Sequence, residues 1–171
     1  DANGAFSPGD AMEKLKRLSE YDIHSIEQPI RPGQCEEMAA LCESSPVPIA
    51  LDEELIGLTE SDKREDLLTK INPQFLIFKP SLIGGMKVCN HWIDLCKKYN
   101  IGWWITSALE SNVGLNAIAQ YTYKLKNPMP QGLGTGGLFT NNIESPLRVK
   151  QGALYHDPLI KWSDTDELFD E

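Results

Sequence analysis

Short apolar runs alternate along the chain with longer segments in which apolar residues recur every three or four positions. In residues 7–21, Met12, Leu15 and Leu18 fall on one helical face and Pro8 stands in the first turn, which predicts a helix. The same period predicts helices over 34–43, 60–71, 84–99 and 112–125, the last capped by Asn112. The apolar runs predict strands over 24–29, 47–52, 74–79 and 102–107.

Strands that alternate with single helices through short loops predict parallel βαβ units and the α/β fold class. A doubly wound sheet and a (β/α) barrel share this alternation, but the spacing favours the barrel. Strand-end positions recur 26, 25, 27, 28 and 25 residues apart, at Asp1, Glu27, Asp52, Lys79, Ser107 and Gly132. A nearly constant repeat places equivalent positions around one rim, where the active sites of barrels assemble. Residues 147–155 are expected to form an extended closing segment.

The chain has 171 residues and is expected to form one domain, a partial barrel over residues 1–171 with an acidic tail at about 163–171. A closed barrel of eight strands needs roughly 200 residues or more. Five strands and the end of a sixth are predicted within this chain, so two or more β/α units are expected to precede Asp1.

The net charge of −9 and the isoelectric point near 4.8 narrow the range of partners. An acidic surface repels phosphate backbones and no basic stripe is present, so no nucleic-acid partner is expected. No apolar run approaches the roughly 18–20 residues of a membrane span, and the first residues do not resemble a signal peptide. A cytoplasmic protein that acts on a small carboxylate, without a membrane partner, is the expectation.

The four cysteines form two pairs, Cys35 with Cys42 and Cys89 with Cys96, each seven residues apart within a predicted helix. Seven residues span about 10 Å along a helix axis, too far for a disulfide. No C-x-x-C motif supports a zinc site. We therefore expect free thiols in the core of a protein from a reducing compartment.

Three carboxylates, those of Asp1, Glu27 and Asp52, stand at three consecutive strand ends. Taken singly, each would be an ordinary loop acid or helix cap. Gathered on one rim they would repel one another and have raised pKa values unless a cation neutralised them. Because carboxylate-rich, all-oxygen coordination selects Mg²⁺ or Mn²⁺ over softer metals, the joint placement predicts such a metal site.

Lys79 ends the next predicted strand, directly after the apolar run Phe75–Phe78. Many lysines in such places only extend their charge from an apolar surface, but beside a divalent cation Lys79 becomes a candidate base or charge stabiliser. Ser107 could make a structural hydrogen bond or contact substrate. The segment Gly132–Gly137 lacks the strand-then-helix context of a dinucleotide loop, and its glycines predict close approach of backbone N–H groups to an anion. The histidines lie outside the rim series and are expected at the surface or an interface: His24, His91 and His156.

Five ordered motifs resemble those of the muconate-lactonising subgroup of the enolase superfamily. They are Asp1–Phe6, Ile26–Pro29, Ala50–Glu53, Phe78–Ser81 followed by Gly84 and Gly85, and Thr106–Ser111 with Gly132–Thr135. The last motif is specifically similar to that of the o-succinylbenzoate synthase family. The resemblance covers nearly the whole chain, and it implies the C-terminal portion, about strands 3 to 8, of an enolase-type (β/α)7β TIM-like barrel.

The resemblance implies Mg²⁺, with Mn²⁺ as a substitute, held by Asp1, Glu27 and Asp52, with Asn3 and Glu53 beside these ligands. The implied reaction is that of a carbon–oxygen lyase in menaquinone biosynthesis. It is the syn-dehydration of 2-succinyl-6-hydroxy-2,4-cyclohexadiene-1-carboxylate to o-succinylbenzoate. The metal would bind the substrate carboxylate and stabilise the enediolate that forms when the α-proton leaves.

In such enzymes a second-strand lysine removes the proton and then assists departure of the hydroxide, and the sixth-strand lysine, here Lys79, places its charge near the ring. Ser107, Gly132 and Leu133 would contact the succinyl arm. The K-x-K motif, the first two strands and the capping domain have no counterpart in these 171 residues. This polypeptide alone is therefore expected to have little or no synthase activity.

Two other functions remain open from the sequence. One is an N-acylamino-acid racemase or dipeptide epimerase of the same superfamily, in which two lysines would act as bases on opposite faces of the substrate. The other is a non-catalytic partial barrel that self-associates, because exposed strand edges and apolar faces favour association.

Overall fold

The computed structural model describes residues 1–163, so the predicted acidic tail lies outside the described residues apart from Ser163. The chain forms two compact units, Asp1–Trp104 and Ile105–Glu171. Each unit is described by itself, and the prediction of one domain over the whole chain stays a prediction.

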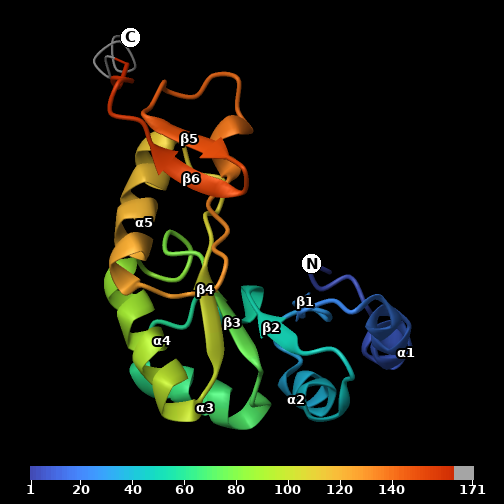
Figure 1. Cartoon of the computed structure of the whole chain (residues 1–171). Coiled ribbons are helices and arrows are strands. Elements are labelled where there is room, and N and C mark those ends of the chain that lie inside the picture. Colours follow the sequence, from blue (N-terminus) through green and yellow to red (C-terminus); the bar gives the residue numbers. More distant parts are fainter. Residues whose placement is uncertain (164–171) are drawn as a thin grey trace. The chain divides into compact units, whose positions relative to one another are not determined.

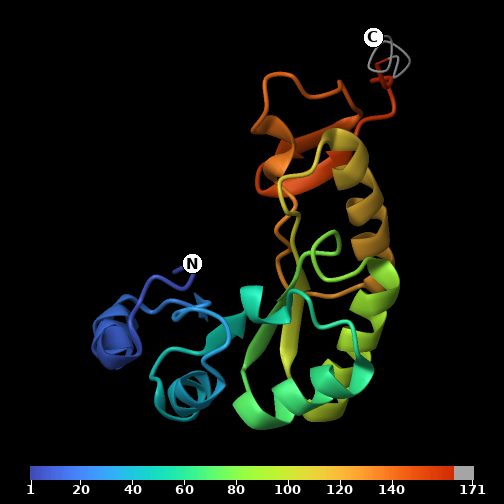
Figure 2. The same cartoon turned by 180° about the vertical axis from the view of Figure 1, so that it is seen from behind.

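The first unit is built around a parallel sheet with the spatial order β1-β2-β3-β4. Its strands are β1 (Ile26–Glu27), β2 (Ile49–Leu51), β3 (Phe75–Phe78) and β4 (Gly102–Ile105), whose last residue is the first of the second unit. The pairs β1–β2 and β2–β3 are parallel. Since crossovers between parallel strands are right-handed, strands in consecutive order place their connecting helices on one face, as Figures 1 and 2 show for this unit.

The helices of this unit occupy the predicted segments to within a few residues. They are α1 (Pro8–Leu18), α2 (Cys35–Ser44), α3 (Ser61–Ile71) and α4 (Met86–Tyr99), with 3-10 turns η1 (Ser19–Tyr21) and η2 (Glu53–Leu55). Asn72 and Asn100, with φ of 51° and 56°, end α3 and α4 in the left-handed conformation that asparagine tolerates. After each of them the chain enters the next strand. Among the helices within residues 1–163, none combines the length and hydropathy needed to cross a bilayer.

Apolar residues fix the strands, and the polar residues extend from the strand ends. Ile49, Leu51 and Ile77 are fully buried, as is usual for the nearly all-apolar strands of parallel sheets. Phe78 packs between Trp92 of α4 and Trp103 of β4, with ring centroids 6.4 and 5.9 Å apart. Burying each such side chain contributes about 1.5–3 kcal/mol, so the positions of the strand ends are strongly determined.

The second unit contains α5 (Asn112–Leu125), the short turn η3 (Thr135–Gly137) and the strands β5 (Leu147–Lys150) and β6 (Ala153–His156). Here the prediction of one extended segment over 147–155 is wrong. β5 and β6 form an antiparallel hairpin, because Gln151 and Gly152 both adopt positive φ, 51° and 75°, and reverse the chain in two residues.

The predicted helix over 112–125 is confirmed, but the predicted capping role of Asn112 is wrong. The cap position is Ser111, and no side-chain hydrogen bond caps the helix. The Asn112 side chain instead donates to the Ile143 carbonyl, and its backbone N–H donates to Asn142 Oδ1 at 2.8 Å. Asn112 therefore ties the start of α5 to the segment before the hairpin.

One glycine of the sheet gives a test of this packing. A Cβ on Gly102 would overlap Cδ1 of the Phe75 ring, which packs against His24 and Trp104 at centroid distances of 4.6 and 5.8 Å. We predict that Gly102→Ala lowers the free energy of unfolding by about 1–3 kcal/mol, and that adding Phe75→Leu restores part of the loss.

The measurement is urea unfolding of the complete gene product. Gly9→Ala in α1 is the matched control, because a Cβ there has no heavy atom within 4 Å. That change should raise the free energy of unfolding by about 0.5–1 kcal/mol. Equal effects of the two alanines would contradict the packing described for β4.

Candidate active site

Three charged side chains meet where the strands of the first unit end. Glu27 is the last residue of β1, Asp52 follows β2, and Lys79 follows β3. Lys79 Nζ lies 3.5 Å from Glu27 Oε1 and forms a shorter ion pair with Asp52 Oδ2. Only 2% of the Asp52 side chain is exposed, against 21% for Glu27 and 19% for Lys79. The structure thus brings together three of the residues that the sequence repeat predicts on one rim.

The pKa values of Glu27 and Lys79 reflect the burial of these groups and the charges around them. Burial raises the pKa of Glu27, and the hydrogen bond with Asp52 and its negative charge raise it further against the opposing effect of Lys79. Burial by itself would lower the pKa of Lys79, but the hydrogen bond to Asp52 and the charges of Asp52, Glu27 and Glu53 outweigh it and raise that pKa. The cluster therefore favours the charged form of Lys79 and disfavours a negative charge on Glu27 beside that of Asp52.

The segment that begins at Asp1 runs beside the end of β1. The Ala2 N–H donates to the Glu27 carbonyl at 3.0 Å, and the Gly4 N–H donates to the Gln28 carbonyl at 2.7 Å. The Asp1 carboxylate itself is exposed and accepts the backbone N–H of Asn3 at 2.7 Å. The backbone of Asp1 is thus next to Glu27, while the Asn3 contact to Asp1 comes from its main chain.

A divalent cation fits part of this arrangement. Within residues 1–163, no three His, Cys, Asp or Glu side chains are grouped so that they could hold a metal ion. Two features still suit a cation with oxygen ligands: Asp52 is buried against Glu27, and Glu53 Oε2 is buried without a hydrogen-bond partner among the described residues. The three-carboxylate set that includes Asp1 stays a prediction.

A fourth polar group, which the sequence reasoning missed, bonds the backbone of Asp52. Gln28 is fully buried, and its side chain reaches the loop after β2. Gln28 Oε1 accepts the N–H groups of Asp52 at 3.1 Å and Glu54 at 3.4 Å, while Nε2 donates to Glu54 Oε2 at 3.1 Å. The available signal was an uncharged amide inside the run Ile26–Ile30, where a polar side chain must find partners if it is buried.

The predicted substrate-contacting residues all belong to the second unit, and two of them touch. The Ser107 N–H donates to the Gly132 carbonyl at 3.0 Å, and the Gly132 N–H donates to the Ile105 carbonyl at 2.8 Å. A Cβ on Gly132 would overlap Thr106 Oγ1, so only glycine allows this approach. The buried Ser107 hydroxyl bonds the Thr135 hydroxyl, which gives it a structural partner; substrate contact stays a prediction.

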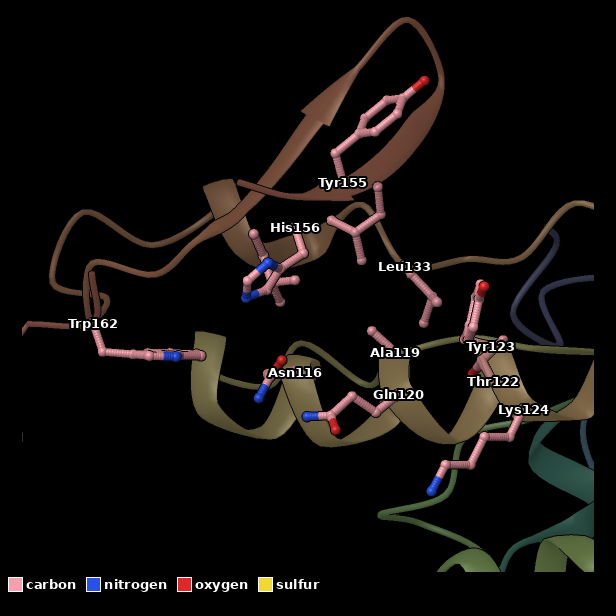
Figure 3. Close-up of a pocket in the computed structure, with 12 residues that line it drawn as sticks. Asn116, Ala119, Gln120, Thr122, Tyr123, Lys124, Leu133, Tyr155, His156 and Trp162 are labelled. Carbon is pink, nitrogen blue, oxygen red and sulfur yellow. The ribbon is translucent and has the colours of Figure 1, made fainter. Parts of the chain in front are cut away.

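Leu133 lies instead on the wall of a cavity of about 790 Å³ between α5 and the hairpin. In Figure 3, Leu133 and His156 point toward Asn116 and Ala119 of α5, and Trp162 lies at one end. The cavity is lined mainly by apolar atoms and does not include Ser107 or Gly132 among its lining residues. Contact of Leu133 with a succinyl group therefore stays a prediction.

The cysteines are free thiols, and burial raises the pKa of Cys42, Cys89 and Cys96 to about 12, so these groups are inert core residues. The expectation of core thiols is confirmed for these three, while Cys35 is only partly buried.

The histidines lie at the surface or between elements, as predicted. His91 of α4 is part of a contact with α3, where its ring nitrogens bond Arg64 Nη1 and Ser61 Oγ, each at 3.0 Å. His24 and His156 are exposed.

Similarity to known proteins identifies the family of this chain. The family described as enolase C-terminal domain-like matches residues 1–158. The chain belongs to this enolase family. An o-succinylbenzoate synthase from Desulfotalea psychrophila is 59% identical over 154 residues, which cover 90% of the chain and 42% of that relative. This enolase-family chain thus spans less than half the length of that protein.

Solved structures agree with the family assignment. MenC from Desulfotalea psychrophila is 59% identical, with a TM-score of 0.87 over 90% of this enolase-family chain and 43% of its own. Muconate cycloisomerase from Pseudomonas fluorescens has a TM-score of 0.83 at 23% identity, over 99% of the chain and 47% of its own, a likeness of fold alone. The predicted fold, the C-terminal portion of an enolase-type barrel, is confirmed, and so is the resemblance to o-succinylbenzoate synthase.

The ion pair of this enolase-family chain gives a prediction for its stability without metal. Lys79→Met leaves two carboxylates facing each other, so the free energy of unfolding should fall by about 2 kcal/mol. This is less than the roughly 3–5 kcal/mol of a fully buried pair, because 19% of the Lys79 side chain is exposed. In an Asp52→Asn background the same change should cost less than about half as much. Urea unfolding in EDTA measures this cycle, and equal costs in the two backgrounds would exclude the coupling.

A second prediction concerns pH. Because the folded state raises the pKa of Glu27 above its ordinary value of 4.5, the folded protein holds this proton more tightly than the unfolded chain. The contribution to stability is present below the ordinary value and is lost as pH rises through the raised pKa.

Glu27→Gln, which is neutral at every pH, should therefore stabilise the metal-free protein more at pH 7 than at pH 4. Unfolding experiments at both pH values test this difference, with Glu20→Gln as the exposed control. A benefit of Glu27→Gln that is the same at pH 4 and pH 7 would mean that the Glu27 pKa is not raised.

Proposed function

We propose that the complete gene product is a Mg²⁺-dependent o-succinylbenzoate synthase that acts in menaquinone biosynthesis. It would convert 2-succinyl-6-hydroxy-2,4-cyclohexadiene-1-carboxylate to o-succinylbenzoate by syn-dehydration through an enediolate. The observation that carries the proposal is the meeting of Glu27, Asp52 and Lys79 at adjacent strand ends. The choice of this particular reaction rests on the 59% identity to a relative named o-succinylbenzoate synthase.

In this proposal Asp1, Glu27 and Asp52 would hold Mg²⁺, and the buried Oε2 of Glu53 would be available to a further partner. The metal would supply a positive charge for the substrate carboxylate and for the negative charge that develops when the α-proton leaves. The burial of Asp52 supports this role, since a carboxylate with little water around it binds a cation more strongly.

Lys79 supplies the second positive charge. Its ion pair with Asp52 keeps Nζ protonated, which suits stabilisation of a developing anion better than proton abstraction. The base would be a lysine outside these 171 residues, and the chain alone would then have little turnover. An electrostatic role for Lys79 also favours a synthase over a racemase, in which both lysines must act as bases.

The second unit would bind the succinyl arm. The backbone around Gly132 comes close to Thr106 because glycine has no side chain, and the Ser107 hydroxyl lies in the same group of contacts. Small hydroxyl side chains such as that of Ser107 are suited to a carboxylate-bearing chain. Leu133 would contact its methylene groups.

The direct test is product formation by the complete gene product with Mg²⁺ and the cyclohexadiene substrate. Asp52→Asn should weaken Mg²⁺ binding at least about tenfold, measured by calorimetry, and lower turnover in proportion. Asp62→Asn, at an exposed position in α3, should change neither quantity.

Absence of product from the wild-type protein would reject the synthase. If deuterium from solvent were then incorporated at the α-carbon of N-succinyl amino acids, the racemase would replace it. If Mg²⁺ did not bind and the protein sedimented as larger species at higher concentration, the self-associating, non-catalytic protein would be favoured.

A further inference from the structure

We propose that Gln28 is a positioning residue of the candidate active site, whose buried amide fixes the backbone of Asp52 so that the Asp52 and Glu27 carboxylates converge on one cation. This inference rests on the proposed function for its metal, and on contacts within the first unit for its geometry. The Gln28 side chain bonds backbone groups and Glu54, so it would act through Asp52 and not on the substrate.

The Gln28 side chain uses its full hydrogen-bonding capacity. Its Oε1 accepts two backbone N–H groups, those of Asp52 and Glu54, at 3.1 and 3.4 Å. Its Nε2 donates to the Ile30 carbonyl at 3.0 Å and to Glu54 Oε2 at 3.1 Å. The opposite orientation of the amide would set N–H against N–H and oxygen against oxygen, so these four partners define one orientation.

The backbone of Gln28 is part of the same arrangement. Its φ of 35° is unusual for a residue other than glycine, and Pro29 follows it directly. Its N–H donates to the Ala50 carbonyl at 2.9 Å, and its carbonyl accepts the Gly4 N–H at 2.7 Å. Gln28, which directly follows β1, therefore joins the segment after Asp1 to the end of β2, and so links the three segments that carry the predicted metal ligands.

Glu54 completes the support. Glu54 is 7% exposed, and its carboxylate accepts hydrogen bonds from the Gly33 N–H at 2.8 Å and from Gln28 Nε2. These bonds hold the turn η2 that starts after Asp52, so the direction of the Asp52 side chain depends on Gln28 and on Gly33, both in the loop between β1 and α2. The loss of the amide would leave buried N–H and carboxylate groups unpaired.

A second glutamine, Gln74, offers a matched control because it bonds the opposite end of β2. Gln74 Oε1 accepts the Ile49 N–H at 2.9 Å, and Nε2 donates to the Cys42 carbonyl at 3.0 Å. Both glutamines thus accept a backbone N–H of the β2 region through the amide oxygen. Gln28 bonds the residue after β2, whereas Gln74 bonds Ile49, the first residue of β2.

The experiment compares Gln28→Met and Gln74→Met in the complete gene product. Both should lower the urea midpoint of unfolding, since each removes hydrogen bonds that are buried at Gln28 and partly buried at Gln74. Only Gln28→Met should weaken Mg²⁺ binding, by at least about tenfold in calorimetry, whereas Gln74→Met should stay within about twofold of wild type. Unchanged affinity in Gln28→Met, or equal losses in the two variants, would overturn the proposal.

Amide hydrogen exchange of the metal-free protein separates this inference from the proposed function. Gln28→Met should accelerate exchange of the Asp52 N–H, and Gln74→Met that of the Ile49 N–H, each at least about tenfold. If the wild-type protein bound no Mg²⁺, the proposed function would fail, and exchange at Asp52 would still decide whether Gln28 anchors this backbone. No acceleration at Asp52 would overturn the anchoring role.

If Gln28→Met does not fold, Glu54→Gln decides the question. This change replaces one carboxylate oxygen with an N–H₂ group, so either Gln28 or Gly33 loses its acceptor. Mg²⁺ affinity should fall at least about threefold, and unchanged affinity in the folded variant would overturn the proposal.

Discussion

The arrangement of the first unit depends on one electrostatic constraint, that two carboxylates brought together at a sheet edge need a positive charge between them. Asp52 has almost no contact with solvent, and burial together with the nearby Asp52 raises the pKa of Glu27. Lys79 supplies the charge in the structure described, and a divalent cation of the predicted type would supply more of it. A site that must bind a cation to relieve repulsion is also a site that can stabilise negative charge on a substrate.

The apolar part of the fold creates this constraint. Buried residues such as Ile49 and Phe78 fix parallel strands whose ends lie at one edge, so the residue after each strand cannot avoid its neighbours. The side chains behind the edge then set the direction of each carboxylate. Gln28 links the ends of β1 and β2, and in our proposal its amide determines how the Asp52 carboxylate is presented.

Much of the fold could be predicted because it rests on local periodicity. The apolar runs located the strands, and the repeat of about 26 residues located Glu27, Asp52 and Lys79 on one edge. The Gln28 network could not be predicted in this way. It joins segments 24 and 26 residues apart in sequence through a side chain whose backbone has a positive φ, and neither the partners nor that φ is evident from residue types. The hairpin at Gln151 was missed because the alternation of apolar and polar residues keeps the same phase on both sides of its two-residue turn. The role of Asn112 was missed because its partner Asn142 lies 30 residues away in sequence.

The central claim is that Glu27 and Asp52 share a divalent cation. A crystal structure of the complete gene product grown with Mn²⁺, with anomalous diffraction data, tests it most directly. The account predicts an anomalous peak at bonding distance from one carboxylate oxygen of Glu27 and one of Asp52. A structure in which Lys79 Nζ stays between these carboxylates and the anomalous signal lies elsewhere, or is absent, would contradict it.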